Sequence, residues 1–389
     1  MIDKIKQLVE ASFDEIVEIR RYIHKNPELS FYEHKTSAYI KTILIGWGIS
    51  FTEDIADTGI VVLLEGNNPS SKTLALRADF DALPITEENE IDYCSVNKGV
   101  MHACGHDVHT ASLLGVVKIL NNLKQEWEGS VKFIFQPAEE MLPGGAQQMI
   151  KEGVLENPKV EKMLGQHVFP DLEVGKVGFR PGKYMASTDE LHICVKGIGG
   201  HAALPHKYNS PLLAAAKLIT ELDESFQKDK DHPSVLAIGF VEGLGSTNVI
   251  PDKVKLKGTL RAMDEDFRAT AHKRMQKIAL EVAKYYGLEI DFDIRKGYPS
   301  LVNDVVLTES AIVLAKEYLG TENVIDLPIR MTAEDFSYYS HEVPSTFYRL
   351  GTANKSKGIT HGLHTSRFNI DEQSLKIGMG LMAYLAIKN

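Results

Sequence analysis

Met101-His102-Ala103-Cys104-Gly105-His106-Asp107-Val108-His109 is the stretch around which the chain is organised, and it holds one thiol, three imidazoles and a carboxylate. Cys104 and His106 lie two positions apart, so in extended or turning backbone both side chains reach one point. Gly105 between them allows a sharp turn. Thiolate and imidazole are the donors that zinc and its transition-metal neighbours prefer. We therefore expect a metal site here, rather than a buried free cysteine beside surface histidines.

Short apolar segments that alternate with helical patterns surround this stretch. A helix is expected wherever apolar residues recur at three- and four-residue spacing, and a buried strand wherever they form a short dense run. The expected helices are 4–24, 35–46 and 109–124, and the expected strands are 60–64, 73–78, 131–135 and one ending at 163–164. Such alternation predicts an α/β fold: a mainly parallel sheet with helices on both faces. Ligands of these sheets bind beyond the carboxyl ends of the strands.

The pattern changes near residue 183 and changes back near residue 297. Between these points apolar and polar residues alternate, as in half-exposed antiparallel strands, and two amphipathic helices are expected at 209–227 and 265–286. The alternating segments are 190–196, 235–241 and 254–263. Helix and strand patterns then resume at 304–319, 346–350 and 371–387. We expect a discontinuous catalytic domain, 1–182 with 297–389, interrupted by an α+β domain at 183–296.

Composition restricts the class of protein. A chain of 389 residues exceeds what one hydrophobic core usually supports, so two domains are expected. The net charge of -10 argues against binding to nucleic acid. The three cysteines suit a reducing compartment, and the longest apolar run, 377–387, is shorter than the ~20 residues of a membrane span. The N-terminal segment lacks the apolar core of a signal peptide. A cytoplasmic protein without a membrane segment is expected.

Further metal-binding side chains follow the expected strands of the sheet. The candidates are Asp79, Asp81, Cys104, His106, Glu139, Glu140, His167 and, far downstream, His364. Paired glutamates are usually solvated and a single histidine after a strand is usually a buried or capping residue, but so many donors at successive strand ends are not explained in this way. They exceed the four ligands of a closed structural zinc site, so two metals or an open catalytic site is implied. One of Glu139 and Glu140 is then free to carry a proton in amide hydrolysis.

Nine short blocks occur in order along nearly the whole chain: RRYIHKNPELSFYE, ALRADFDALP, HACGHDVHTA, FQPAEE, GGHAALPH, STNVIPD, GTLRAMDE, MTAEDFSYY and LHTSRFNID. Through these blocks the chain resembles the di-metal aminoacylase, hippurate hydrolase and auxin-conjugate amidohydrolase branch of the aminoacylase/carboxypeptidase metallopeptidase family. The resemblance implies hydrolysis of the amide bond of N-acyl-L-amino acids by two divalent ions per subunit (Zn, Mn, Co or Ni). It also implies that the inserted domain is a lid through which a homodimer forms.

The resemblance also implies roles for individual residues. The metal ligands would be Cys104, His106, Glu140, His167 and His364. Glu139 would be the general base and acid, with Asp81 as a further catalytic residue. His201 in the insert would stabilise the oxyanion in the active site of the partner subunit. Asn248 and Arg261 would hold the carboxylate of the substrate.

The second block departs from the wider family, where a histidine ligand stands at the position of Asp79. The role of Asp79 therefore stays open, and Cys104 stands where a bridging aspartate would be expected. Asp107 is interpreted as an acceptor for a ligand imidazole, and His109 as a cap of the helix that follows it. His24 is interpreted as a surface or capping residue.

Three other functions remain possible from the residues. A dipeptidase or aminopeptidase would use the same two-metal site. A cysteine hydrolase would use Cys104 as nucleophile and His106 as base, and would keep its activity in EDTA. A non-catalytic metal-binding protein would leave Glu139 without a task.

Overall fold

The computed structural model describes residues 1–389, which divide into two compact units. The first comprises Met1–Gly182, Val302–Pro328 and Asp335–Asn389. The second comprises Lys183–Leu301 and Ile329–Glu334. None of the helices combines the length and apolar character needed to cross a membrane.

An eight-stranded sheet forms the centre of the first unit, in the order β1-β2-β4-β3-β5-β16-β6-β15. The four central strands β4, β3, β5 and β16 run parallel, whereas β1 and β2 join antiparallel at one side. Their bounds are β1 Phe51–Ile55, β2 Gly59–Glu65, β3 Thr73–Asp79, β4 Ser130–Gln136, β5 Lys162–Glu173, β6 Val177–Phe179, β15 Val324–Asp326 and β16 Ser345–Ala353. The expected α/β class with a mainly parallel central sheet is confirmed.

Helices cover both faces of this sheet. Leu74 and Leu76 of β3 belong to the same apolar core as α3, which also packs against α1 and α9. Arg77 points to the opposite face of the strand, where it reaches Asp335 close to α4 and α8. The helices are α1 Ile2–Lys25, α2 His34–Gly46, α3 His106–Asn122, α4 Gly145–Lys151, α7 Val305–Leu319, α8 Ser337–Glu342 and α9 Ser374–Lys388. The short strands β7, Gly182–Met185, and β14, Leu301–Asn303, form a separate two-stranded sheet.

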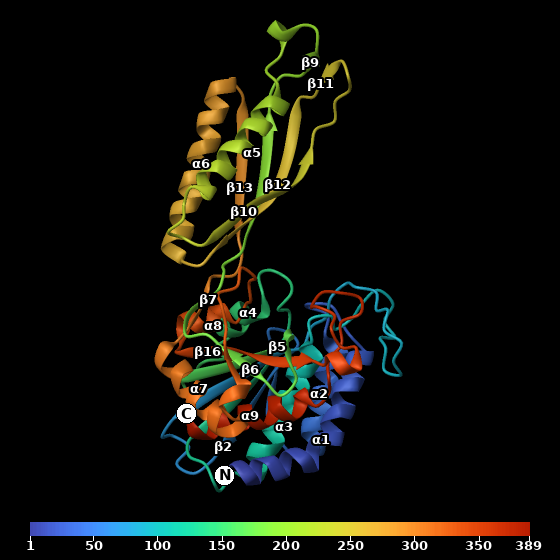
Figure 1. The fold of residues 1–389 in the computed structure, drawn as a ribbon, viewed down its shortest axis with the longest axis vertical. Coiled ribbons are helices and arrows are strands. Elements are labelled where there is room, and N and C mark those ends of the chain that lie inside the picture. Colours follow the sequence, from blue (N-terminus) through green and yellow to red (C-terminus); the bar gives the residue numbers. More distant parts are fainter. The chain divides into compact units, whose positions relative to one another are not determined.

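The second unit is an antiparallel sheet in the order β10-β12-β8-β13, with α5 and α6 packed on one face. Its elements are β8 Asp189–Lys196, β9 Gly200–His201, α5 Pro211–Gln227, β10 Ser234–Glu242, β11 Val249–Ile250, β12 Lys253–Ala262, α6 Glu265–Tyr286 and β13 Glu289–Lys296. The strands β9 and β11 form a small hairpin-like pair at one end of the unit (Figure 1). Strand β13 was not expected, because its charged residues hide the alternation of Ile290, Phe292 and Ile294.

Cys194 of β8 does not face the core of the insert, although it lies in a strand with alternating apolar residues. The buried residues of that strand are Leu191, Ile193 and Val195, so Cys194 lies on the other face and is half-buried. Because side chains alternate along a strand, a displacement by one position reverses the face.

Candidate metal centre

The stretch from Cys104 to His106 makes the turn that the glycine between them allows. Gly105 has φ +81°, a left-handed conformation, and a Cβ atom there would lie 2.5 Å from Cγ2 of Val168. Only glycine therefore combines this backbone angle with this close packing. Helix α3 begins at His106, directly after the turn. Cys104 lies in the loop before α3, and His106 lies in the first turn of that helix. Both side chains are buried, and His106 contacts Asp81, which follows the end of β3.

Cys104, His106 and His167 form a first group of donors. Their ligand atoms lie within 4.8 Å of one another, with Sγ of Cys104 3.4 Å from Nε2 of His167. Strand β5 supplies His167, whose Nδ1–H donates to the carbonyl oxygen of Val168 at 2.7 Å. This hydrogen bond leaves the lone pair of Nε2 directed toward Cys104, as a metal-binding histidine requires.

A second group shares the same sulfur. It comprises Cys104, Glu140 and His364, whose ligand atoms also lie within 4.8 Å of one another. Nε2 of His364 is 3.3 Å from Sγ of Cys104 and 3.2 Å from Oε1 of Glu140. The backbone N–H of His364 donates to the carbonyl of Ala103 at 2.8 Å, which keeps the distant loop beside the turn. The structure thus brings together all five predicted ligands, and Cys104 is common to both groups.

Asp81 connects the two groups. Its Oδ1 accepts the Nδ1–H of His106 at 3.0 Å, so Nε2 of His106 faces the donor cluster. Its Oδ2 accepts hydrogen bonds from the hydroxyl of Ser30 at 2.6 Å and from the N–H of Glu140 at 2.9 Å. Asp81 therefore orients a residue of each group, an arrangement that raises the basicity of a ligand imidazole.

The donor set fits divalent cations. Nε2 of His106 and Oε1 of Glu140 are buried, form no hydrogen bond and lie 3.9 Å apart. Buried polar atoms without partners are costly, and a cation between them removes that cost. Burial alone lowers the pKa of His106, but the carboxylates of Asp79, Asp81 and Glu140 outweigh it and raise this pKa to about 10. The cluster thus carries an excess of negative charge that only a cation or a proton can balance.

Glu139 adjoins both groups. Its side chain is buried, and a carboxylate oxygen lies within 4.8 Å of ligand atoms of His106 and Glu140. The N–H of Asp335 donates to Oε1 of Glu139 at 3.4 Å. Glu139 is therefore at a position from which it can exchange a proton with a group bound in the cluster.

Both carboxylate oxygens of Asp79 are already engaged in hydrogen bonds. Its Oδ1 accepts the Nδ1–H of His109 at 2.5 Å, and its Oδ2 accepts from Arg77 at 2.5 Å. Nε2 of His109 accepts the N–H of Val168 at 2.9 Å. The expectation that His109 caps the following helix was wrong, because α3 begins at His106 and His109 lies inside it. Asp79 and His109 therefore link β3, α3 and β5.

Asp107 and His24 also differ from expectation. His24 is fully buried rather than on the surface, and its Nδ1 lies 2.8 Å from Oδ2 of Asp107. The same oxygen accepts from Nε of Arg20 at 2.7 Å, so Asp107 is held by α1 and orients none of the five ligands. The sequence obscured this contact because α1 and α3 are far apart along the chain.

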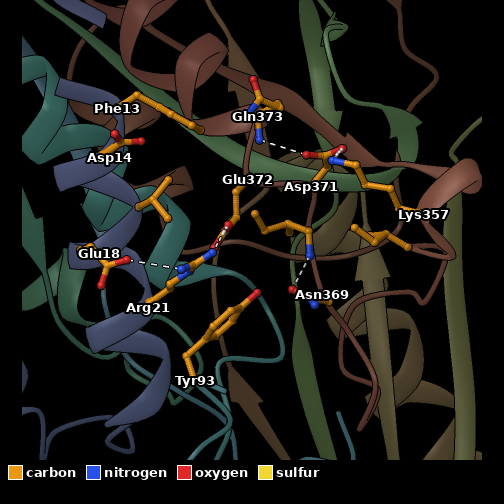
Figure 2. Close-up of a pocket in the computed structure, with 13 residues that line it drawn as sticks. Phe13, Asp14, Glu18, Arg21, Tyr93, Lys357, Asn369, Asp371, Glu372 and Gln373 are labelled. Carbon is orange, nitrogen blue, oxygen red and sulfur yellow. Dashed lines mark hydrogen bonds and ion pairs between the residues drawn. The ribbon is translucent and has the colours of Figure 1, made fainter. Parts of the chain in front are cut away.

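A pocket of about 440 Å³ lies between α1 and the segment 357–373. Figure 2 shows the side chains that line it. None of the predicted site residues lines it. Arg21 donates to both carboxylate oxygens of Glu372, at 2.9 and 2.8 Å, and so ties this segment, which carries His364, to α1. The acids and bases that line the pocket are engaged largely with one another, as are Lys357 and Asp371 at 3.0 Å.

Of the three predicted residues of the insert, two lie side by side and the third, Arg261, lies elsewhere in the unit. His201 is exposed on β9, and the N–H of Ala202 next to it donates to the carbonyl of Asn248 at 3.0 Å. Strand β12 begins at Lys253, a few residues after Asn248, and Arg261 lies near its far end. At ~3.3 Å per residue, Arg261 is about 26 Å from Lys253. Its Nη1 is buried and forms no hydrogen bond, so a guanidinium donor is available there. His201 and Asn248 are neighbours, whereas Arg261 and Asn248 of one chain are not.

Sequence reasoning missed several side chains that support the cluster. Arg77, Ser30 and Glu33 are all buried and contact the residues described above or the backbone beside them. A signal existed, since Ser30 and Glu33 lie in the first of the nine blocks and Arg77 in the second. Their types suggested surface positions, and nothing local indicated their partners.

Comparison with known proteins places these features in context. The sequence profile of peptidase family M20/M25/M40 matches residues 75–388. An N-acyl-L-amino acid amidohydrolase of Geobacillus stearothermophilus is 38% identical over 77% of this chain and 81% of its own length. Thermostable carboxypeptidase 2 of Saccharolobus solfataricus is 36% identical over 100% of this chain and 98% of its own. The crystal structure of a dinuclear metal-binding peptidase of the M20 family from Bacillus subtilis has a TM-score of 0.82 at 32% identity, covering 97% of this chain and 98% of that one.

Proposed function

The chain belongs to peptidase family M20/M25/M40 and is a metal-dependent amidohydrolase; we propose that it hydrolyses the amide bond of N-acyl-L-amino acids, releasing a carboxylate and a free amino acid. One observation carries the proposal: two donor groups share the sulfur of Cys104, and the carboxylate of Glu139 lies beside them. This arrangement combines a two-cation site with a separate proton carrier.

The proposed ligands are Cys104, His106 and His167 for one cation and Cys104, Glu140 and His364 for the other. Two divalent cations held there would polarise the amide carbonyl and activate water. The thiolate favours Zn, Co or Ni, while the carboxylate of Glu140 also suits Mn.

Glu139 is the proposed general base and acid. It takes a proton from the attacking water and passes it to the leaving nitrogen, so that the amine departs neutral. Asp81 acts on this step indirectly, since both of its oxygens accept hydrogen bonds from Ser30, His106 and the backbone of Glu140. We therefore propose a positioning role for Asp81.

The insert supplies the remaining proposed contacts. The buried, unpaired Nη1 of Arg261 suits the carboxylate of an amino acid, which a guanidinium binds through parallel hydrogen bonds. His201 and Asn248 would act in the active site of a partner subunit. A homodimer is supported by the edge strand β10, which exposes Val235, Phe240 and Val241, because an exposed apolar edge favours pairing with a second copy.

A dipeptidase or aminopeptidase is the second candidate, and the carboxypeptidase relative favours it. The two functions differ in whether the substrate nitrogen is acylated or a free amine lies next to the scissile bond. Purified protein should be assayed with N-acetyl-, N-benzoyl- and indole-acetyl-amino acids beside the matching dipeptides, with Zn, Mn, Co and Ni in turn. Faster turnover of the dipeptides would reject the proposal. We further propose a cytoplasmic location, because Cys94, Cys104 and Cys194 are all free thiols.

A further inference from the structure

Two buried carboxyl groups hold the backbone on either side of Glu139. The N–H of Ala138 donates to Oε1 of Glu33 at 2.9 Å, and the N–H of Glu140 donates to Oδ2 of Asp81 at 2.9 Å. The direction of the Glu139 side chain depends on both peptide groups. Asp81 also serves His106, whereas Glu33 has no contact with any of the five ligands among its hydrogen bonds.

Ala138 has a backbone conformation that alanine rarely adopts. Its φ is +53°, in the left-handed region, where the Cβ atom approaches the following carbonyl oxygen. The residue is held there from both sides, since its N–H reaches Glu33 and its carbonyl accepts the N–H of Gly145 at 2.9 Å. Strain of this kind persists only where the surroundings enforce it, and it concentrates at functional sites.

Glu33 is suited to this task by its surroundings. It is fully buried just before α2, and the hydroxyl of Thr58 lies 3.3 Å from its second oxygen. Burial and the charge of Asp81 raise the pKa of Glu33 to about 8, so the carboxyl is largely neutral at pH 7. Glu33 accepts the N–H of Ala138 on one oxygen and the hydroxyl of Thr58 on the other. Glutamine keeps a carbonyl oxygen for the N–H of Ala138, and the hydroxyl of Thr58 can accept a hydrogen bond from its amide group instead.

We propose that Glu33 is a positioning residue for catalysis: by holding Ala138 in its left-handed conformation, it aims the carboxylate of Glu139 at the reacting atoms. The inference rests on the proposed role of Glu139 as the proton carrier. Glu33 lies at the N-terminus of α2, 105 positions along the chain from Ala138. Its contact with this segment is the hydrogen bond to the backbone N–H of Ala138.

The first test compares Glu33→Ala with Glu33→Gln, on the best substrate found for the wild type. Glu33→Ala should lower kcat by about 10- to 100-fold, because a small misplacement of a catalytic group has this effect, while KM and the metal content stay unchanged. Glu33→Gln should keep kcat within about threefold of the wild type, since it retains the hydrogen bond. Equal losses in both variants, or loss of metal in Glu33→Ala, would overturn the proposal.

The second test asks whether relief of the strain replaces Glu33. Glycine adopts positive φ without a steric cost, so Ala138→Gly in the Glu33→Ala background should raise kcat by about fivefold or more. A merely structural role for Glu33 predicts no such rescue. Glu28→Ala is the matched control: Glu28 caps the same helix through the N–H of Thr36 at 2.8 Å and does not touch Ala138. Ala138→Gly should not rescue any defect of that variant.

A third measurement does not depend on activity. Hydrogen–deuterium exchange in a peptide covering residues 136–140 should accelerate in Glu33→Ala and remain at the wild-type rate in Glu33→Gln and Glu28→Ala. Unchanged exchange in Glu33→Ala would show that the hydrogen bond does not hold the segment. If exchange accelerates but kcat does not fall, the segment is held as described and Glu139 is not the proton carrier, so the failure lies with the proposed mechanism.

Discussion

Nδ1 of His106 lies 3.0 Å from Oδ1 of Asp81, and this contact directs the other ring nitrogen of His106 into the donor cluster. The same carboxylate receives the N–H of Glu140 through its second oxygen. One aspartate therefore sets the orientation of a residue in each donor group.

Asp81→Asn should weaken metal binding. Both oxygens of Asp81 accept hydrogen bonds, so an amide NH2 group would face a donor on one side or the other. Loss of such a supporting contact typically lowers metal affinity about 10- to 100-fold. Competition with a chelator measures the affinity. Ser30→Ala is the control, since it removes one donor to Asp81 and leaves the contact with His106; an Asn variant that binds metal as tightly as this control would contradict the assignment.

Substitution of Glu139 should remove catalytic turnover, whereas substitution of Glu140 should remove bound metal. Glu139→Gln keeps the size of the side chain but cannot carry a proton, so kcat should fall by roughly 10²- to 10⁴-fold. Its metal content, measured by mass spectrometry, should equal that of the wild type. Glu140→Ala should lose metal. A metal-free Glu139→Gln protein beside a fully loaded Glu140→Ala protein would exchange the two roles.

Cys104 should be protected by bound metal. Coordination deprotonates a thiol and occupies its sulfur, so the loaded protein should resist a thiol reagent at Cys104 over the pH range in which the metal stays bound. In chelated protein, burial and the carboxylates of Glu140 and Glu139 raise the pKa of this thiol well above its ordinary value. Its labelling should therefore increase steeply with pH, because the thiolate is the reactive form. Cys94 gives the internal reference, and labelling of Cys104 that ignores metal would refute the ligand assignment.

Arg261 should recognise the carboxylate of the substrate. Conversion of that carboxylate to an amide should lower kcat/KM strongly for the wild type and very little further for Arg261→Ala, because the two changes remove the same contact. Arg295→Ala is a matched control, since Arg295 is an exposed arginine of the same unit paired with Asp293. It should retain the full preference for the carboxylate. Independent, additive losses from the Arg261 change and the amide change would show that the two groups do not meet.

Features that depend on neighbouring residues in the sequence could be predicted, whereas contacts between residues far apart in the sequence could not. The dense apolar run of β3 and the spacing in α1 are local patterns, and they predicted the α/β fold. The turn at Gly105 was also readable, because two donors flanked one glycine. The partner of His24 lies 83 positions away, and Glu33 acts through a backbone N–H 105 positions away, so no local pattern indicates either contact. Buried ionic side chains look like surface residues until their partners are known.

The relation between His201 and Glu139 can be tested by mixing two inactive proteins. His201 is exposed on β9 of the second unit, whereas Glu139 belongs to the first unit. If its imidazole donates to the tetrahedral oxyanion, His201→Ala should lower kcat by about 10²- to 10³-fold. Glu139→Gln should also be nearly inactive. Neither defect alone tells which subunit provides the histidine.

Unfolding and refolding the two variants together distinguishes the arrangements. A mixed dimer contains one active site with an intact Glu139 and, from the partner, an intact His201. Random association makes about half of the dimers mixed, with one competent site of two, so activity should recover to about a quarter of the wild type. If His201 acts within its own chain, no mixed dimer has a complete site. A mixture that stays inactive, although labelled subunits demonstrably exchange, would exclude the shared active site.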